Sequence, residues 1–173
     1  MKGGIGTASV TIDGVTVGAI IACNALGDVL DPDTAQVVAG ARSSDGSRLI
    51  DTRRALLRGE PPQPLLAGTN TTIGVIATDA VITKAQASRL ATVGHDGLAR
   101  AINPVHTMSD GDTLFCLGTG AAGRSLGMMV LATMAAEAVA QATLQAVLHA
   151  NRLQIEAGEN HQDLHLPSAA DLQ

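Results

Sequence analysis

The sequence predicts an α+β fold with the order strand, strand, loop, strand, helix, strand, helix. Two observations favour it: an Asp-Gly pair between alternating apolar residues near the N-terminus, and two later strand-like runs that are each followed by a helical stretch. The chain has 173 residues, of which 46% are hydrophobic and 16% charged, which is sufficient for one core. We therefore expect residues 1–173 to form a single domain.

The first strands form a hairpin in this prediction, because apolar residues alternate from Ala8 to Ala22 around Asp13-Gly14. Residues 24–41 contain Gly and Asp-Pro breaks and are expected to be a loop with strand fragments. Residues 42–66 are rich in Ser, Asp, Arg and Pro. We interpret them as an exposed linker without a helix or a central strand.

The second half begins with Thr71–Thr78, a β-branched run whose apolar character favours burial on both faces. Thr83 and Gln86 have the spacing of a capping box and open a helix that ends near Ile102. Leu114–Thr119 is a further predicted strand.

A long Ala-, Met- and Leu-rich helix is predicted over 124–156. Residues 158–173 are mostly polar and are expected to be a frayed tail. The apolar stretch of the long helix is interrupted by Glu137, Gln141 and Gln145, so we interpret it as a buried helix and not as a membrane span.

Composition excludes several classes of protein. The net charge is −5, with 11 basic and 16 acidic residues, and aromatic content is 1%. Neither phosphate binding nor base stacking is favoured, so no nucleic acid or membrane partner is expected. Cys23 and Cys116 lie in apolar runs, which is typical of buried free thiols. No signal-peptide pattern is present, and we expect a cytoplasmic location.

No cofactor or metal site is predicted. Gly3-Gly4-Ile5-Gly6 precedes a strand where a phosphate-binding loop would precede a helix. The histidines lack metal-ligand spacing. They are His95, His106, His149, His161 and His165.

The Asn70-Thr71 pair lies where the Pro-rich linker enters a predicted buried strand. β-Propensity alone explains a threonine there. A polar junction between an exposed linker and a buried strand is also what an autoproteolytic precursor requires.

Four segments taken in order resemble the motifs of the DmpA-type aminopeptidase and nylon-oligomer hydrolase family, and the similarity runs from Lys2 to about Gly120. They are Lys2–Ala8 (KGGIGTA), Asn24 after Ala22-Cys23, Asn70–Ala80 (NTTIGVIATDA) and Ser109–Thr113 (SDGDT). The resemblance implies an αββα sandwich, shared with ornithine acetyltransferase. Family members carry a long segment before the Lys-Gly-Gly motif, so the sandwich is expected to be incomplete on its N-terminal side.

The resemblance also implies cleavage between Asn70 and Thr71. Residues 1–70 would then end an α-subunit, and 71–157 would form the core of a β-subunit. The freed Thr71 would be the nucleophile and its α-amine, with a reference pKa of about 7.7–8.0, the base.

Four further residues gain roles from the resemblance. Asn24 would stabilise the oxyanion, and Lys2 would act near the nucleophile through its charge or a hydrogen bond. Asp110 and Asp112 would orient the threonine and its amine, chiefly in self-cleavage. Alternatively, Lys2 is an ordinary flexible N-terminal lysine. Asp110 and Asp112 can likewise be explained as part of a Ser-Asp-Gly-Asp turn.

The implied activity is hydrolysis of a small peptide or linear amide through an acyl-enzyme, by an aminopeptidase, β-aminopeptidase or aminohexanoate-oligomer hydrolase. Two alternatives remain: acyl transfer of the ornithine-acetyltransferase type, and a catalytically silent fragment that acts only as a structural or interaction module. Missing strands would leave exposed edges and apolar faces, so we expect a homo-oligomer.

Overall fold

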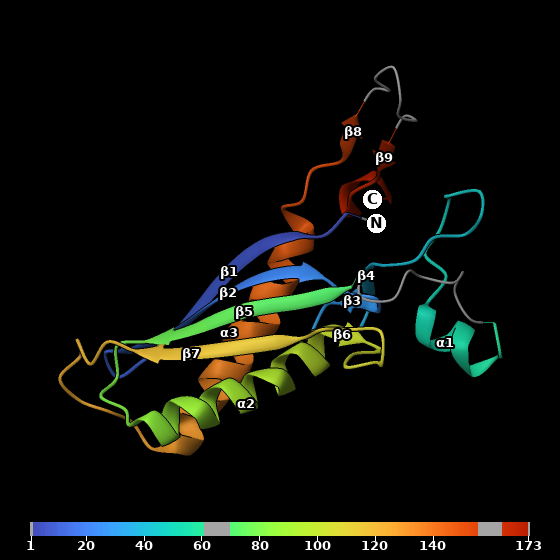
Figure 1. Ribbon diagram of the computed structural model, residues 1–173. Coiled ribbons are helices and arrows are strands. Elements are labelled where there is room, and N and C mark those ends of the chain that lie inside the picture. The colour runs from blue at the N-terminus through green and yellow to red at the C-terminus, as the bar shows by residue number, and fades with distance from the viewer. Residues whose placement is uncertain (1, 61–69, 156–163, 173) are drawn as a thin grey trace.

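A four-stranded sheet forms the centre of the computed structural model, which describes residues 2–60, 70–155 and 164–172. Its order is β1-β2-β5-β7, with β1 (Gly4–Ile12), β2 (Val15–Asn24), β5 (Thr71–Thr78) and β7 (Thr113–Gly118). β2 is antiparallel to both β1 and β5, whereas β5 and β7 are parallel (Figure 1). The predicted N-terminal hairpin is confirmed.

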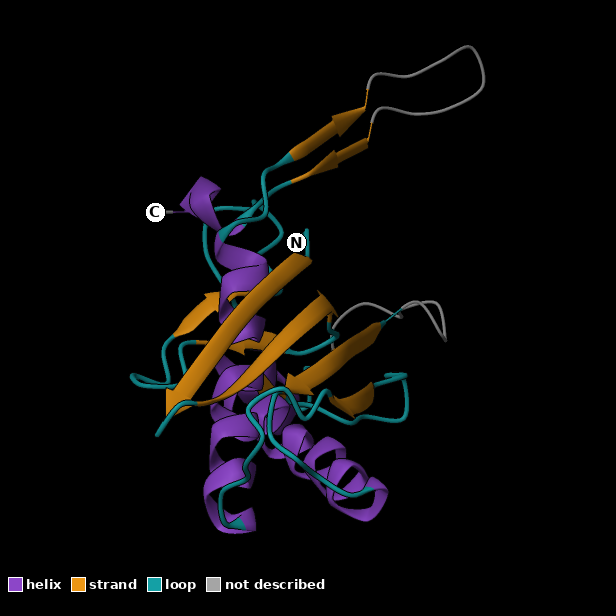
Figure 2. Cartoon of the chain, turned by 90° about the vertical axis from the view of Figure 1, so that its left-hand side faces the viewer, coloured by secondary structure: helices purple, strands orange, loops and turns teal. Residues whose placement is uncertain are grey.

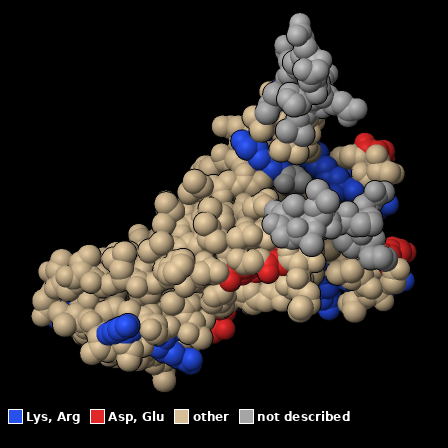
Figure 3. All heavy atoms as spheres, in the orientation of Figure 1, with Lys and Arg blue, Asp and Glu red and all other residues tan. Residues whose placement is uncertain are grey.

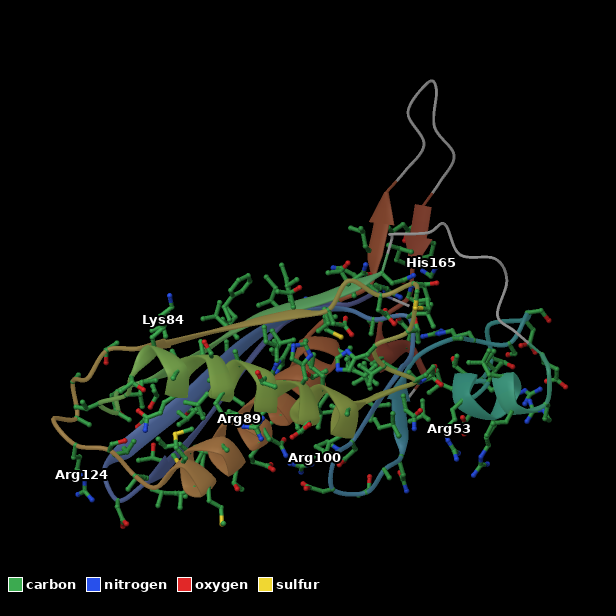
Figure 4. The ribbon with its side chains drawn as sticks, turned by 60° about the horizontal axis from the view of Figure 1, so that its bottom comes forward. Arg53, Lys84, Arg89, Arg100, Arg124 and His165 are labelled. Carbon is green, nitrogen blue, oxygen red and sulfur yellow. The ribbon has the colours of Figure 1, made fainter. Side chains whose placement is uncertain are left out.

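Two long helices cover one face of this sheet (Figure 2). α2 (Lys84–Ala101) packs against β7, and α3 (Met128–Leu148) packs against β1, β2 and α2. The Thr83–Gln86 capping box is present, as predicted. Arg100, labelled on α2 in Figure 4, forms an ion pair with Glu137 on α3 over 2.7 Å.

α3 is shorter than the predicted 124–156, because Gly127 is its N-cap and His149 its C-cap. Its length and composition would allow it to cross a membrane, but 61% of its most apolar window is buried inside the protein. The interpretation as a core helix therefore fits its packing.

The glycines of the N-terminal motif bring α3 directly onto β1. A Cβ atom at Gly4 would lie 2.3 Å from the carbonyl oxygen of Ala146, and one at Gly6 would lie 2.1 Å from that of Ala142. No other residue fits at these two positions without moving the helix. Close packing of the helix on the sheet thus explains this part of the motif.

The opposite face of the sheet is apolar and exposed. β5 was predicted to be buried on both faces, and this is wrong for the described chain: Ile76 is 0% exposed, but Ile73 is 49% exposed. The reason is that no described segment covers that side. We call it the open face and define it by Ile5, Ile20, Ile73, Phe115 and Leu117. The surface over these strands carries few charged side chains in the view of Figure 3.

A smaller sheet lies beside one end of the main sheet. Its order is β4-β3-β6, with β3 (Asp28–Leu30), β4 (Val37–Ala39) and β6 (Ile102–Asn103). The strand fragments predicted within 24–41 are therefore present.

The prediction that 42–66 contains no helix is wrong, because α1 (Thr52–Leu57) lies in this segment. Asp51 caps it by accepting a hydrogen bond from the backbone N–H of Arg54 over 3.0 Å. The buried carboxylate of Asp28 accepts hydrogen bonds from both the backbone and the hydroxyl of Thr52. The proline-rich residues 61–66 lie outside the described residues.

The described part of the C-terminal tail, residues 164–172, forms regular secondary structure where a frayed tail was expected. β8 (Leu153–Ile155) pairs with β9 (Leu164–Leu166), and the 3-10 helix η1 (Ala169–Leu172) follows. The backbone N–H of Lys2 donates to the carbonyl oxygen of Pro167 over 2.9 Å, and Ser168 is buried. Residues 156–163, including His161, lie outside the described residues.

Candidate active site

Asn24 and Thr71 face each other across the last register position of β2 and β5. Side chains alternate along a strand, so both lie on the side of the sheet that carries Ile20 and Ile73. A cavity of about 200 Å³ next to them is lined by Lys2, Asn24 and Asn70, among others. The fold thus brings the predicted lysine, asparagine and junction to one end of the sheet.

The Asn70–Thr71 junction is held by two hydrogen bonds to one oxygen. The Thr71 hydroxyl donates to the carbonyl oxygen of Asn70 over 2.6 Å, and the backbone N–H of Gly111 donates to the same oxygen over 3.2 Å. A Cβ atom at Gly111 would lie 3.1 Å from Thr71 Oγ1. The hydroxyl therefore lies beside the carbonyl group that it would attack in self-cleavage.

The Asp110 side chain forms hydrogen bonds with two loops next to this junction. Its Oδ1 accepts the backbone N–H of Leu26 over 3.2 Å, and its Oδ2 accepts the hydroxyl of Thr107 over 2.7 Å. A parallel bridge joins Asp110 to Asn70. Its carboxylate thus contacts Leu26, which lines the cavity, and Thr107 in its own loop, so the turn and the site interpretations both apply.

Asp112 lies against the residue that follows Thr71. Its Oδ1 accepts the backbone N–H of Thr72 over 2.9 Å. Its Oδ2 lies 2.8 Å from His106 Nδ1, and the Asp112 side chain is only 4% exposed. The two aspartates of the motif therefore contact different parts of the junction.

Two histidines extend this contact away from the junction. His106 Nε2 lies 3.3 Å from His95 Nδ1, with ring centroids 4.8 Å apart. Burial and the neighbouring His106 lower the pKa of His95, and Asp112 and Asp96 act in the opposite direction. A hollow of about 380 Å³ is lined by both rings, by Asp110 and Asp112 and by two threonines.

Sequence reasoning missed Gly111, His95 and His106. The glycine lies inside the Ser-Asp-Gly-Asp motif, which was the one signal that could have indicated it. The histidines come from α2 and from the loop before β7, and no motif links them. Within the described ranges, no group of three or more His, Cys, Asp or Glu residues is placed to hold a metal ion.

The wall of the cavity depends on Asp28, which is 1% exposed. Besides Thr52, its carboxylate accepts the backbone N–H of Ala41 over 3.0 Å. Burial raises the pKa of the Asp28 carboxyl. The Ala41 N–H, the Thr52 N–H and the Thr52 hydroxyl thus all donate to this one carboxylate, which fixes the two segments that carry them. Ala41 and Thr52 both line the cavity.

Both cysteines are free thiols, as predicted. Cys23 is buried beside Thr72, and burial raises the pKa of its thiol. Cys116 is half-buried, and burial raises the pKa of its thiol too. Burial therefore favours the neutral thiol over the reactive thiolate at both positions.

The architecture belongs to the Ntn-hydrolase fold class. It superposes with a TM-score of 0.62 on L-aminopeptidase D-Ala-esterase/amidase from Ochrobactrum anthropi, at 21% identity over 99% of this chain and 47% of that one. A β-aminopeptidase from Burkholderia gives a TM-score of 0.54 at 26% identity, over 88% of this chain and 44% of that one. The predicted α+β class is confirmed, and the chain covers about half of each solved structure, in agreement with an incomplete αββα sandwich.

The chain belongs to peptidase family S58, whose family model matches residues 1–161. It is 44% identical to an uncharacterized aminopeptidase of Mycobacterium leprae over 131 residues, which are 70% of this chain and 34% of that protein. It is 29% identical to a 6-aminohexanoate-oligomer endohydrolase of Agromyces over 119 residues, or 67% and 33% of the two chains. This chain thus spans about a third of the length of these curated relatives.

Proposed function

We propose that this chain provides the self-processing centre of an amide hydrolase, with Thr71 as the nucleophile once the Asn70–Thr71 bond is cut. One observation carries the proposal: the Thr71 hydroxyl and the Gly111 N–H converge on the carbonyl oxygen of Asn70, at 2.6 and 3.2 Å. A hydroxyl and an N–H donor at one carbonyl group are the arrangement that acyl transfer requires, and this supports the proposal.

Self-cleavage begins when Thr71 Oγ1 bonds to the carbonyl carbon of Asn70 and loses its proton. The negative charge that develops on the carbonyl oxygen is stabilised by the Gly111 N–H, which already points at it. The carbon–nitrogen bond then breaks, the nitrogen takes up a proton, and an ester joins Asn70 to the threonine hydroxyl. Water hydrolyses this ester and leaves Thr71 with a free α-amine.

In later turnovers the α-amine accepts the proton of its own hydroxyl, because its reference pKa of about 7.7–8.0 lies close to working pH. Asn24, opposite Thr71, supplies a side-chain amide for the substrate oxyanion. Lys2 lines the same cavity, where its charge keeps the amine neutral or its ammonium group donates a hydrogen bond.

The substrates that fit this proposal are linear amides. The relatives are an aminopeptidase, a β-aminopeptidase and a 6-aminohexanoate-oligomer endohydrolase, by their names. All three names denote hydrolysis of an amide bond. An N-terminal aminoacyl or β-aminoacyl peptide and an aminohexanoate oligomer are therefore the compounds to assay.

The open face supports a larger assembly. Ile5, Ile73 and Phe115 are 66%, 49% and 61% exposed on one apolar surface, which favours association. We propose that the chain is a homo-oligomer.

Intact mass spectrometry of purified protein tests the nucleophile. Wild type and Thr71→Ser should each yield fragments 1–70 and 71–173, because both retain a hydroxyl, whereas Thr71→Ala should remain whole. Circular dichroism confirms that all three are folded. Folded wild type that stays uncut, or a Thr71→Ala variant that is cut at the same bond, would overturn the proposal.

A further inference from the structure

A line of hydrogen bonds runs behind the proposed nucleophile, on the helix side of the sheet. It joins the Thr72 N–H to Asp112 over 2.9 Å, Asp112 to His106 over 2.8 Å, and His106 to His95 over 3.3 Å. We call these three side chains, Asp112, His106 and His95, the relay. Because a carboxylate only accepts hydrogen bonds, His106 Nδ1 carries the proton in the bond to Asp112.

We propose that His106 is a positioning residue for self-cleavage, which fixes the Asp112 carboxylate and through it the backbone of Thr71. This inference rests on the function proposed above. Gly111 holds the peptide group before Thr71, and Asp112 holds the peptide group after it. With both peptide planes fixed, the hydroxyl stays directed at the Asn70 carbonyl.

The backbone at His106 has an uncommon conformation. Its φ is 54°, in the left-handed region that is rare for non-glycine residues but in which His, Asn and Asp are enriched. From this loop the imidazole Nδ1 contacts the Asp112 carboxylate over 2.8 Å. Its side chain is 39% exposed, so solvent protons reach the relay.

The two rings of the relay contact each other through a single proton. Only one proton fits between His106 Nε2 and His95 Nδ1 at 3.3 Å. The charged or titratable groups around the pair are Asp96 on α2 and Asp110 and Asp112 before β7.

A matched pair of substitutions isolates the hydrogen bond from the backbone. His106→Asn and His106→Gly both suit the left-handed backbone, but only Asn keeps an N–H near the position of Nδ1. Self-cleavage after refolding from denaturant should be slowed about ten- to a hundredfold in His106→Gly. In His106→Asn it should stay within a few-fold of wild type.

Rescue by His106→Asn is a readout that a purely structural role of the ring would not give, because Asn restores only the N–H that donates to Asp112. Equal cleavage rates for the Gly and Asn variants would overturn the inference.

A measurement without cleavage separates this inference from the proposed function. In the uncut Thr71→Ala background, the NMR resonance of the Thr72 amide should shift on adding His106→Gly and stay nearly unchanged on adding His106→Asn. If it does so while folded wild type is never cut, the proposed function fails and the relay is only structural. If wild type is cut and the Thr72 amide resonance changes with neither substitution, the proposed function stands and only the positioning role of His106 is wrong.

Discussion

The backbone N–H of Gly111 donates to the carbonyl oxygen of Asn70 over 3.2 Å, in a position where a side chain would press on the Thr71 hydroxyl. A Cβ atom there would lie 3.1 Å from Thr71 Oγ1, which is closer than ordinary van der Waals contact. The glycine therefore provides both a donor and the space for the nucleophile.

Gly111→Ala should slow self-cleavage, because the methyl group displaces the hydroxyl by a few tenths of an ångström while the N–H remains. We expect a loss of up to about tenfold, since small misplacements of a nucleophile are costly. Cleavage followed by mass spectrometry measures it, with Ser109→Ala as a control in the same loop. An unchanged rate would show that the hydroxyl adapts.

Asn24→Ala should reduce amide turnover by processed protein about 100- to 1,000-fold, because loss of one oxyanion donor has this effect in other acyl-transfer enzymes. The loss should fall on kcat more than on KM, since the amide acts on the transition state. Thr7→Ala, on β1, is the control. A change in KM alone would assign Asn24 to substrate binding.

Asp28→Ala should destabilise the protein by about 1–3 kcal/mol or more, because it leaves donors from Thr52 and Ala41 without an acceptor. Asp28→Asn keeps one acceptor oxygen and should lower the free energy of unfolding by less than Asp28→Ala does. Urea unfolding curves measure both, and Asp45→Ala, on an exposed turn, serves as a control. A near-neutral Asp28→Ala would mean that water replaces the carboxylate.

Stability should decrease on mild acidification because the pKa of His95 is lowered from its ordinary value of 6.5 by burial and by His106. Above pH 6.5 the imidazole is neutral in both states. As the pH falls from there through the lowered pKa, the unfolded chain takes up the proton first, so the free energy of unfolding drops. Urea midpoints across this range should depend less on pH in His95→Gln; an equal dependence would contradict the assignment.

Phe115→Thr should weaken self-association, because Phe115 is 61% exposed on the open face and Thr retains β-propensity. Light scattering over a range of concentrations measures the mass of wild type and variant. Leu57→Thr, at an exposed position on α1, controls for a general loss of surface hydrophobicity. A wild type that is monomeric throughout would contradict the predicted oligomer.

Short sequence patterns predicted those elements whose defining contacts join residues only a few positions apart. The Asp13-Gly14 turn predicted the hairpin, and Thr83 with Gln86 predicted the start of α2. α1 and the C-terminal strand were missed, because each depends on distant partners: Thr52 on Asp28, and the segment around Pro167 on Lys2. Exposure of β5 was missed because burial depends on the layers that surround a sheet.

The sequence by itself determined the family motifs and the place of Asn70-Thr71 at the entry to a strand, whereas the register of β2 and β5 placed Asn24 opposite Thr71. Only the tertiary structure decided that Gly111 shares the Asn70 carbonyl and that His95 and His106 lie behind Asp112. The physical reason is distance along the chain: strand pairing brings Asn70 beside Asp110, and helix packing brings α2 beneath the same strand end. No local pattern of residue types encodes either contact.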